Sequence, residues 1–210
     1  DFGPEGPEGI SGDPRGNLKA RLKQAEYPYV AANILDKETR KRLPLPNTTP
    51  HLLLNAGSLK IGVIGLTTET TSVTTRTEYV KDLDFSKLSQ TTIEQAKVLR
   101  EKGANIVLLL AHVGLMCPSD YQYKIHSQKE QERSCNPKEE LVQVIKSLPK
   151  GTLDGVISGH SHQIIHHWVD DIPVIQAGAS GLYYNLLYLT YNWDQKRLVP
   201  SLNRIEGPVA

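Results

Sequence analysis

The chain lacks the features that mark membrane-spanning and nucleic-acid-binding proteins. No apolar run approaches the roughly 20 residues that a transmembrane helix needs. Acidic and basic side chains almost balance, with 23 Asp and Glu against 24 Lys and Arg, so the formal net charge is +1. The basic residues form no stripe of the kind that binds a phosphate backbone. We therefore expect neither a nucleic-acid partner nor a transmembrane segment in this chain.

No internal repeat is apparent, and the 210 residues suit one domain or most of one. An apolar content of 39% and a charged content of 22% are typical of a globular chain with a core. Residues 1–16 hold five glycines and three prolines, and this composition predicts a loop.

Cysteine is scarce: the chain has two, Cys117 and Cys135. The segment between them is polar, which is typical of a loop closed by a disulfide in an oxidising compartment. We expect a disulfide, which over about 17 intervening residues would stabilise by about 3 kcal/mol, and with it an exported protein. Two unpaired thiols are the alternative. A zinc site that uses both sulfurs is disfavoured, because no Cys-x-x-Cys spacing is present.

The apolar pattern predicts two successive strand–helix–strand units. Strands are expected at residues 59–66, 106–111 and 155–158. Apolar residues recur at helical spacing from Ile93 to Leu99, and Asn136 and Pro137 are a suitable cap and first helical residue for a second helix. Such units imply an α/β fold with right-handed crossovers.

Histidines follow two of these predicted strands. His112 comes directly after the strand at 106–111, and Gly159-His160-Ser161-His162 follows the strand at 155–158. Alternate residues of an extended segment share a face, so His160 and His162 can face one metal centre or two adjacent ones. Neutral imidazole is a common ligand for divalent transition metals. Because ligands of open α/β sheets bind beyond the carboxyl ends of strands, we expect a metal site there, with His112 and His160 close together.

These histidine motifs resemble those of a known family. Residues 111–114 (Ala-His-Val-Gly) and 159–162 (Gly-His-Ser-His) look like the second half of the calcineurin-like metallophosphoesterases. The closer resemblance is to the 5'-nucleotidase branch, through residues 27–34, 60–68 and 172–179, which come in family order. The resemblance implies a metallophosphoesterase-type α/β/β/α sandwich.

The resemblance also implies that part of the family's site precedes Asp1. The other metal ligands of the family lie in an Asp-x-His, a Gly-Asp and a Gly-Asn-His-Glu motif. Residues 1–4 are similar to the sequence that directly follows the Gly-Asn-His-Glu motif in family members. We therefore expect the C-terminal larger part of the fold. Its parts would be a Gly/Pro-rich loop at 1–16, a partial metallophosphoesterase domain at 17–195 and a C-terminal tail or linker at 196–210. A missing N-terminal segment and a C-terminal substrate-binding domain would be its partners.

By resemblance, His112 and His160 would hold one metal and His162 the other, giving two divalent transition metals (Zn, Mn or Fe) in the complete protein. No catalytic residue is expected in this chain, since these would lie in the missing part. Tyr183 and Asn185 are expected to line the substrate cleft. The neighbouring histidines at 166 and 167 are expected as strand and turn residues, not as ligands.

The function that the resemblance implies is hydrolysis of nucleotide phosphate esters by a periplasmic, cell-surface or secreted enzyme. On this interpretation the chain by itself is inactive. The alternative is a non-catalytic module of the same fold, which binds a partner or a single metal.

Overall fold

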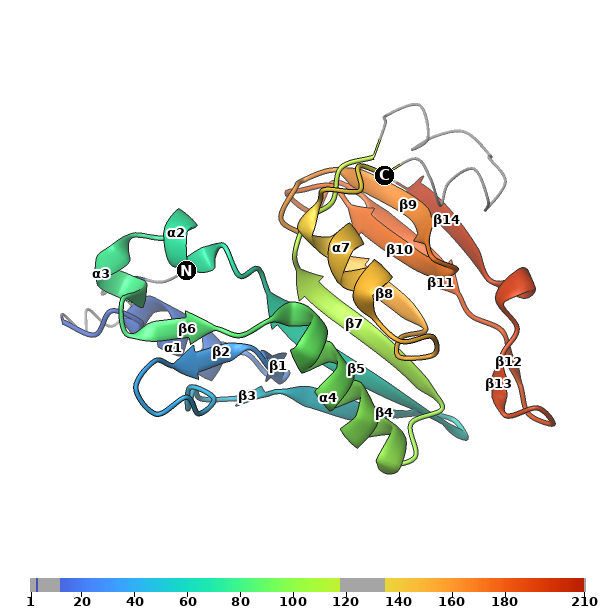
Figure 1. The fold of residues 1–210 in the computed structure, drawn as a ribbon, viewed down its shortest axis with the longest axis horizontal. Helices are drawn as coiled ribbons and strands as arrows, with labels where there is room; N and C mark the ends of the chain where they lie inside the picture. The colour runs from blue at the N-terminus through green and yellow to red at the C-terminus, as the bar shows by residue number, and fades with distance from the viewer. Residues whose placement is uncertain (1–2, 4–11, 118–134, 210) are drawn as a thin grey trace.

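A six-stranded mixed sheet forms the centre of the structure (Figure 1). The computed structural model describes residue 3 and residues 12–117 and 135–209. The strands of the sheet, in spatial order, are β4 (His51–Ala56), β5 (Leu59–Thr67), β7 (Ile106–His112), β8 (Gly155–Ser158), β10 (Ile172–Ala177) and β9 (Ile164–Val169). The four inner strands run parallel, and both edge strands are antiparallel to their neighbours.

Two helices, α4 (Leu88–Glu101) and α7 (Glu140–Ser147), contact the sheet and each other. At Gly62 of β5 an added Cβ would meet the side chain of Leu99 in α4, so the helices cover this face. Leu99, Val107 and Leu141 are buried in the core that results. Full burial of such a side chain contributes about 1.5–3 kcal/mol, so this core holds the parallel strands together.

A second, smaller sheet lies on the opposite face. It pairs β11 (Tyr184–Tyr188) antiparallel with β14 (Arg204–Val209), and both strands contact the central sheet. At Gly155, which is in register with Leu108, an added Cβ would meet Leu187 of β11. Successive residues of a strand point to opposite faces, so this is the face away from α4. Leu110 and Ile157 on the same face stay 43% and 37% exposed, so β11 and β14 cover only part of it.

Most of the remaining elements come from the N-terminal half of the chain and form a smaller group with its own core. A second cluster of buried side chains there comprises Ile34, Val80, Leu83 and Phe85. Its elements are α1 (Gly16–Gln24), β1 (Tyr29–Val30) parallel to β3 (Thr48–Thr49), β2 (Ile34–Asp36) antiparallel to β6 (Leu83–Phe85), α2 (Thr71–Thr74) and α3 (Thr77–Val80). The last small pair is β12 (Tyr191–Asn192) with β13 (Arg197–Leu198), followed by a 3-10 turn at Pro200–Leu202.

The predicted α/β class is confirmed, and the three predicted strands match β5, β7 and β8 to within a residue. Two expectations differ. The second helix begins at Glu140 rather than beside Asn136, because the Asn136 side chain accepts the Lys138 N–H in a turn (3.0 Å). Residues 196–210, expected as a tail or linker, contain β14, which is paired with β11.

The expected disulfide joins Cys117 to Cys135, at the end of the β7 segment and the approach to α7. The polar segment between the two cysteines lies outside the described residues. Among the described residues, no helix is both long and apolar enough to cross a membrane.

Candidate metal centre

His112 and His160 lie side by side where β7 and β8 end. The two strands are parallel and in register at Ala111 and Ser158, so both finish at the same edge of the sheet. His112 Nε2 is 3.2 Å from His160 Nδ1, and the ring centroids are 5.0 Å apart with an interplanar angle of 70°. The expected proximity of these two histidines is therefore confirmed.

The spacing of this pair fits a metal ion. Two nitrogen atoms that bind one tetrahedral zinc at about 2.0–2.1 Å would lie about 3.3 Å apart, close to the 3.2 Å between His112 and His160. Both residues are exposed, so the nitrogens are open to an ion from solvent. Two imidazoles thus offer half of a tetrahedral ligand set.

His162 does not complete a three-ligand cluster with this pair. His160 and His162 have φ values of 83° and 58°, so the chain turns through two left-handed residues instead of continuing extended as the alternation argument assumed. Only one set of three candidate ligands in the described part of the chain has all its atoms within 4.8 Å of one another, and it contains none of these histidines. The structure brings two of the three expected ligands together, and the third lies near them but outside such a cluster.

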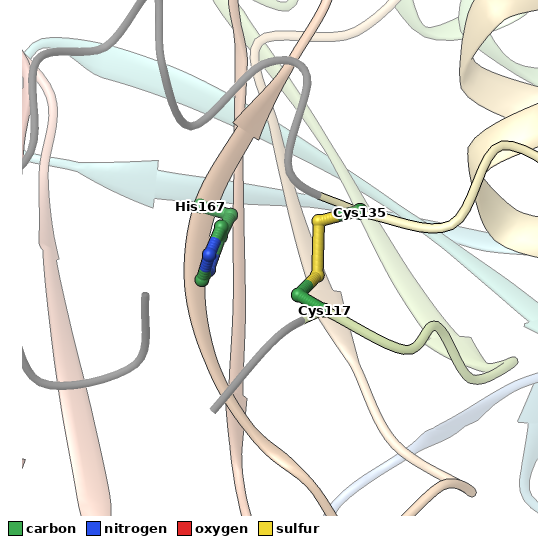
Figure 2. Close-up of side chains that lie close together, drawn as sticks. All are labelled: Cys117, Cys135 and His167. Atoms are coloured by element: carbon green, nitrogen blue, oxygen red, sulfur yellow. A yellow bond between two sulfur atoms is a disulfide. The ribbon is translucent and has the colours of Figure 1, made fainter. Parts of the chain in front are cut away.

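The set with three close ligand atoms is Cys117, Cys135 and His167 (Figure 2). Its two sulfurs are bonded to each other, and a metal requires thiolates. His167 is fully buried in β9 beside the disulfide, as a strand residue. The oxidised protein therefore has no metal site at this cluster.

The environment of His112 favours the neutral ring. Partial burial lowers the pKa of His112, and the neighbouring His160 and His162 lower it further. A metal binds the deprotonated nitrogen, so a lowered pKa reduces the competition from protons. His112 is thus suited to ligation near neutral pH.

Tyr183 and Asn185 occupy different environments. Tyr183 is 39% exposed and its ring lies near Gly178, where an added Cβ would also come within 3.9 Å of the His162 carbonyl. The Asn185 amide instead donates to the carbonyls of Ile165 (3.1 Å) and Gln176 (2.9 Å), and so links β11 to β9 and β10. Tyr183 lies on the side of the histidines, whereas Asn185 has a structural contact; a substrate role for either residue stays a prediction.

Two hollows lie elsewhere. One, of about 740 Å³, has Arg40, Glu69, Phe85 and Lys87 among its lining residues. The other, of about 610 Å³, is lined by residues that include Lys150, Asp154 and Arg197. None of the three histidines lines either hollow. All three are exposed at the sheet edge.

Sequence reasoning gave no role to Ser161 and Gln176. Ser161 lies between His160 and His162 in the sequence, and Gln176 Nε2 donates a hydrogen bond to Ser161 Oγ at 2.9 Å. The sequence signal for this contact is the single amide side chain within the apolar segment Ile172–Ala177. Interpreting the segment only as an apolar strand gives that amide no role.

Comparison with known proteins supports the resemblance. No family model matches the chain. It is 29% identical to the protein UshA of Yersinia enterocolitica over 168 residues, which are 77% of this chain and 28% of that protein. It is 30% identical to a 5'-nucleotidase of Vibrio cholerae over 150 residues, which are 70% of this chain and 24% of that protein. The chain thus spans about a quarter of the length of these curated relatives.

The fold is shared with solved structures. The structure of the calcineurin-like phosphoesterase YfkN of Bacillus subtilis is similar to this one, with a TM-score of 0.67 and 17% sequence identity. The match covers 91% of this chain and 58% of the YfkN chain. That similarity establishes the fold, and the sequence relatives together with the ordered motifs establish the branch. The chain belongs to the 5'-nucleotidase branch of the calcineurin-like metallophosphoesterases.

Proposed function

We propose that this chain is part of a dinuclear-metal phosphoesterase that hydrolyses nucleotide phosphate esters. The observation that carries the proposal is the 3.2 Å convergence of His112 Nε2 and His160 Nδ1 at the sheet edge. The name of a relative, 5'-nucleotidase, supports the substrate class. The disulfide supports an exported protein, at the periplasm, the cell surface or outside the cell.

In this proposal His112 and His160 hold one divalent transition metal and His162 contributes to the second. The position of His162 outside a three-ligand cluster with the pair agrees with such a division. Bound metals would polarise phosphoryl oxygens and lower the pKa of a bound water. The chain's own part is to hold neutral imidazole nitrogens in place. In this proposal Tyr183 contacts the substrate, which its position near Gly178 and the His162 carbonyl supports.

Further ligands must come from elsewhere in the complete protein, because three histidines cannot complete two metal sites. His112 shares a face of β7 with Leu110, which is exposed there. A segment that covered Leu110 and Ile157 would lie next to the histidines and could supply a bridging carboxylate. The incomplete cover of this face therefore supports the proposed N-terminal contribution.

The test compares this chain with the complete protein on 5'-AMP and on a chromogenic phosphodiester, with added manganese or zinc. We expect metal-dependent turnover by the complete protein and none by this chain. Replacing His112 or His160 by Ala in the complete protein should lower kcat at least about 100-fold, since metals supply most of the transition-state stabilisation. His51→Ala is the matched control, because His51 lies on edge strand β4 and bonds Gln95.

Two outcomes contradict the proposal. Turnover by this chain at the rate of the complete protein would show that the site is assigned to the wrong residues. A complete protein that is inert on all such esters would instead favour the non-catalytic module.

A further inference from the structure

Gln176 places a buried amide in the apolar strand β10. Its side chain is 2% exposed, and Nε2 donates to Ser161 Oγ at 2.9 Å and to the Gln163 carbonyl at 2.7 Å. Residues 159–163, here called the histidine loop, carry His160 and His162. One amide thus fixes the middle and the end of this loop to the central sheet.

Ser161 also bonds to the segment that follows β7, the strand that ends in His112. Its hydroxyl donates to the carbonyl of Leu115, three residues after His112, at 3.0 Å. The two segments are also in close contact, since a Cβ added at Gly114 would lie 2.8 Å from the Cβ of Ser161. The bonds Gln176–Ser161–Leu115 therefore join β10, the histidine loop and the segment after His112.

The orientation of the Gln176 amide is set by its partners. The Gln163 carbonyl can only accept a hydrogen bond, so Nε2 must face it. The oxygen Oε1 then lies 3.4 Å from Ser158 Oγ and 3.3 Å from Ser161 Oγ. A glutamate at this position would turn a carboxylate oxygen towards the Gln163 carbonyl, so the site requires an amide.

The histidine loop needs such support because its backbone is strained. His160 and His162 are both left-handed, with φ of 83° and 58°, and lie on either side of Ser161. For residues other than glycine this conformation costs about 1–2 kcal/mol each, and it persists only where the surroundings over-determine it. The bonds to Ser161 and Gln163 act within and directly after the strained pair.

We propose that Gln176 and Ser161 are positioning residues, which hold the His160 imidazole against that of His112 in the geometry that a metal requires. Neither side chain is itself a ligand. The inference rests on the proposed function in taking a metal as what the pair binds. Loss of partners outside the ligand set typically weakens metal binding about 10–100-fold.

The experiment uses three variants of the chain: Gln176→Leu, Ser161→Ala and, as a control, Val174→Ala. Val174 is a fully buried residue of the same strand, two positions before Gln176, so its truncation destabilises the sheet without removing a bond to the histidine loop. Two quantities are measured: the Kd for zinc, and the nuclear Overhauser effect between the His112 and His160 rings without metal. Thermal unfolding of each variant gives its loss of stability.

We expect Gln176→Leu and Ser161→Ala to raise the zinc Kd about 10–100-fold and to abolish the ring-to-ring effect. Val174→Ala should leave the zinc Kd and the ring-to-ring effect equal to those of the wild type within error, even if it loses as much thermal stability as the other two variants. Kd values and ring contacts equal to those of the control would overturn the inference. If Gln176→Leu fails to fold, the result for Ser161→Ala tests the inference, because that substitution removes only one hydroxyl group.

Failure of the proposed function has a different signature. A wild-type chain that shows the ring-to-ring effect but binds no zinc would count against the metal, while the effect of each variant on ring contact would still decide the positioning role. A wild-type chain without that effect would overturn the inference itself.

Discussion

At the scale of single residues, backbone strain and buried polar side chains mark the histidine edge of the sheet. The position of His112 and His160 at the carboxyl ends of two parallel strands predicted that they would meet, because that prediction depends only on where the strands end. The left-handed backbone of His160 and His162 was not predictable, because a pattern of residue types favours glycine and not histidine for such φ values. The contacts of Gln176 depend on long-range packing, which no local pattern contains.

His166 gives a prediction about pH. Its Nε2 is buried and has no hydrogen-bond partner among the described residues, and burial lowers its pKa. The folded protein therefore holds a proton on this ring less readily than the unfolded chain, where an imidazole gains its proton near pH 6.5. The unfolded state therefore binds more protons below about pH 6.5, and the free energy of unfolding falls as the solution becomes more acidic.

Replacing His166 by Phe should flatten this dependence. Urea unfolding of wild type and His166→Phe at pH 7 and pH 5 measures it, with a smaller drop between the two pH values expected for the variant. His112 contributes in the same direction, because its pKa is also lowered, so some acid sensitivity remains. An identical drop in both proteins would show that His166 titrates alike in the folded and unfolded states.

At the scale of elements, the strands were easier to predict than the helix ends. Strands β5, β7 and β8 are largely apolar runs, and short apolar runs of this kind are typical of the inner strands of a parallel sheet. The cap expected at Asn136 was misplaced because its side chain stabilises a turn before the helix. Strand β14 was missed because Gly207 and Pro208 interrupt its alternation.

The start of α7 is fixed by a contact with another element. The Glu140 carboxylate accepts hydrogen bonds from the Thr68 hydroxyl (2.5 Å) and from the Glu69 N–H (3.1 Å), directly after β5. Glu140→Ala should lower the free energy of unfolding by about 1.5–3 kcal/mol, the range for hydrogen bonds to a charged group. Chemical denaturation measures the change, and Lys146→Ala on the exposed side of the same helix is the control, expected within about 0.5 kcal/mol of wild type. Equal effects of the two substitutions would refute a specific role for Glu140.

At the scale of the whole molecule, the disulfide closes the connection between β7 and α7 in the second strand–helix–strand unit. It closes the chain between Cys117, after β7, and Cys135, before α7. Replacing both cysteines by Ser should lower the free energy of unfolding by about 3 kcal/mol, mainly by freeing the unfolded chain. Unfolding of the variant and of wild type with and without a reducing agent measures this. A reductant should affect only the wild type, and equal stability in all samples would mean that the bond is absent in solution.

The pairing of β7 with β8 makes the two imidazoles a test of whether the sheet has assembled correctly. His112 and His160 are 48 positions apart in the sequence, and they meet only when Ala111 lies opposite Ser158. A slip of one residue would displace His160 by about 3.3 Å and turn its strand's side chains to the other face. Local helix formation cannot create this contact, so during refolding the ability to capture zinc should appear only with the native β7–β8 alignment. The same two nitrogens that suit the chain for ligation thus make metal uptake a kinetic probe of this non-local pairing of strands.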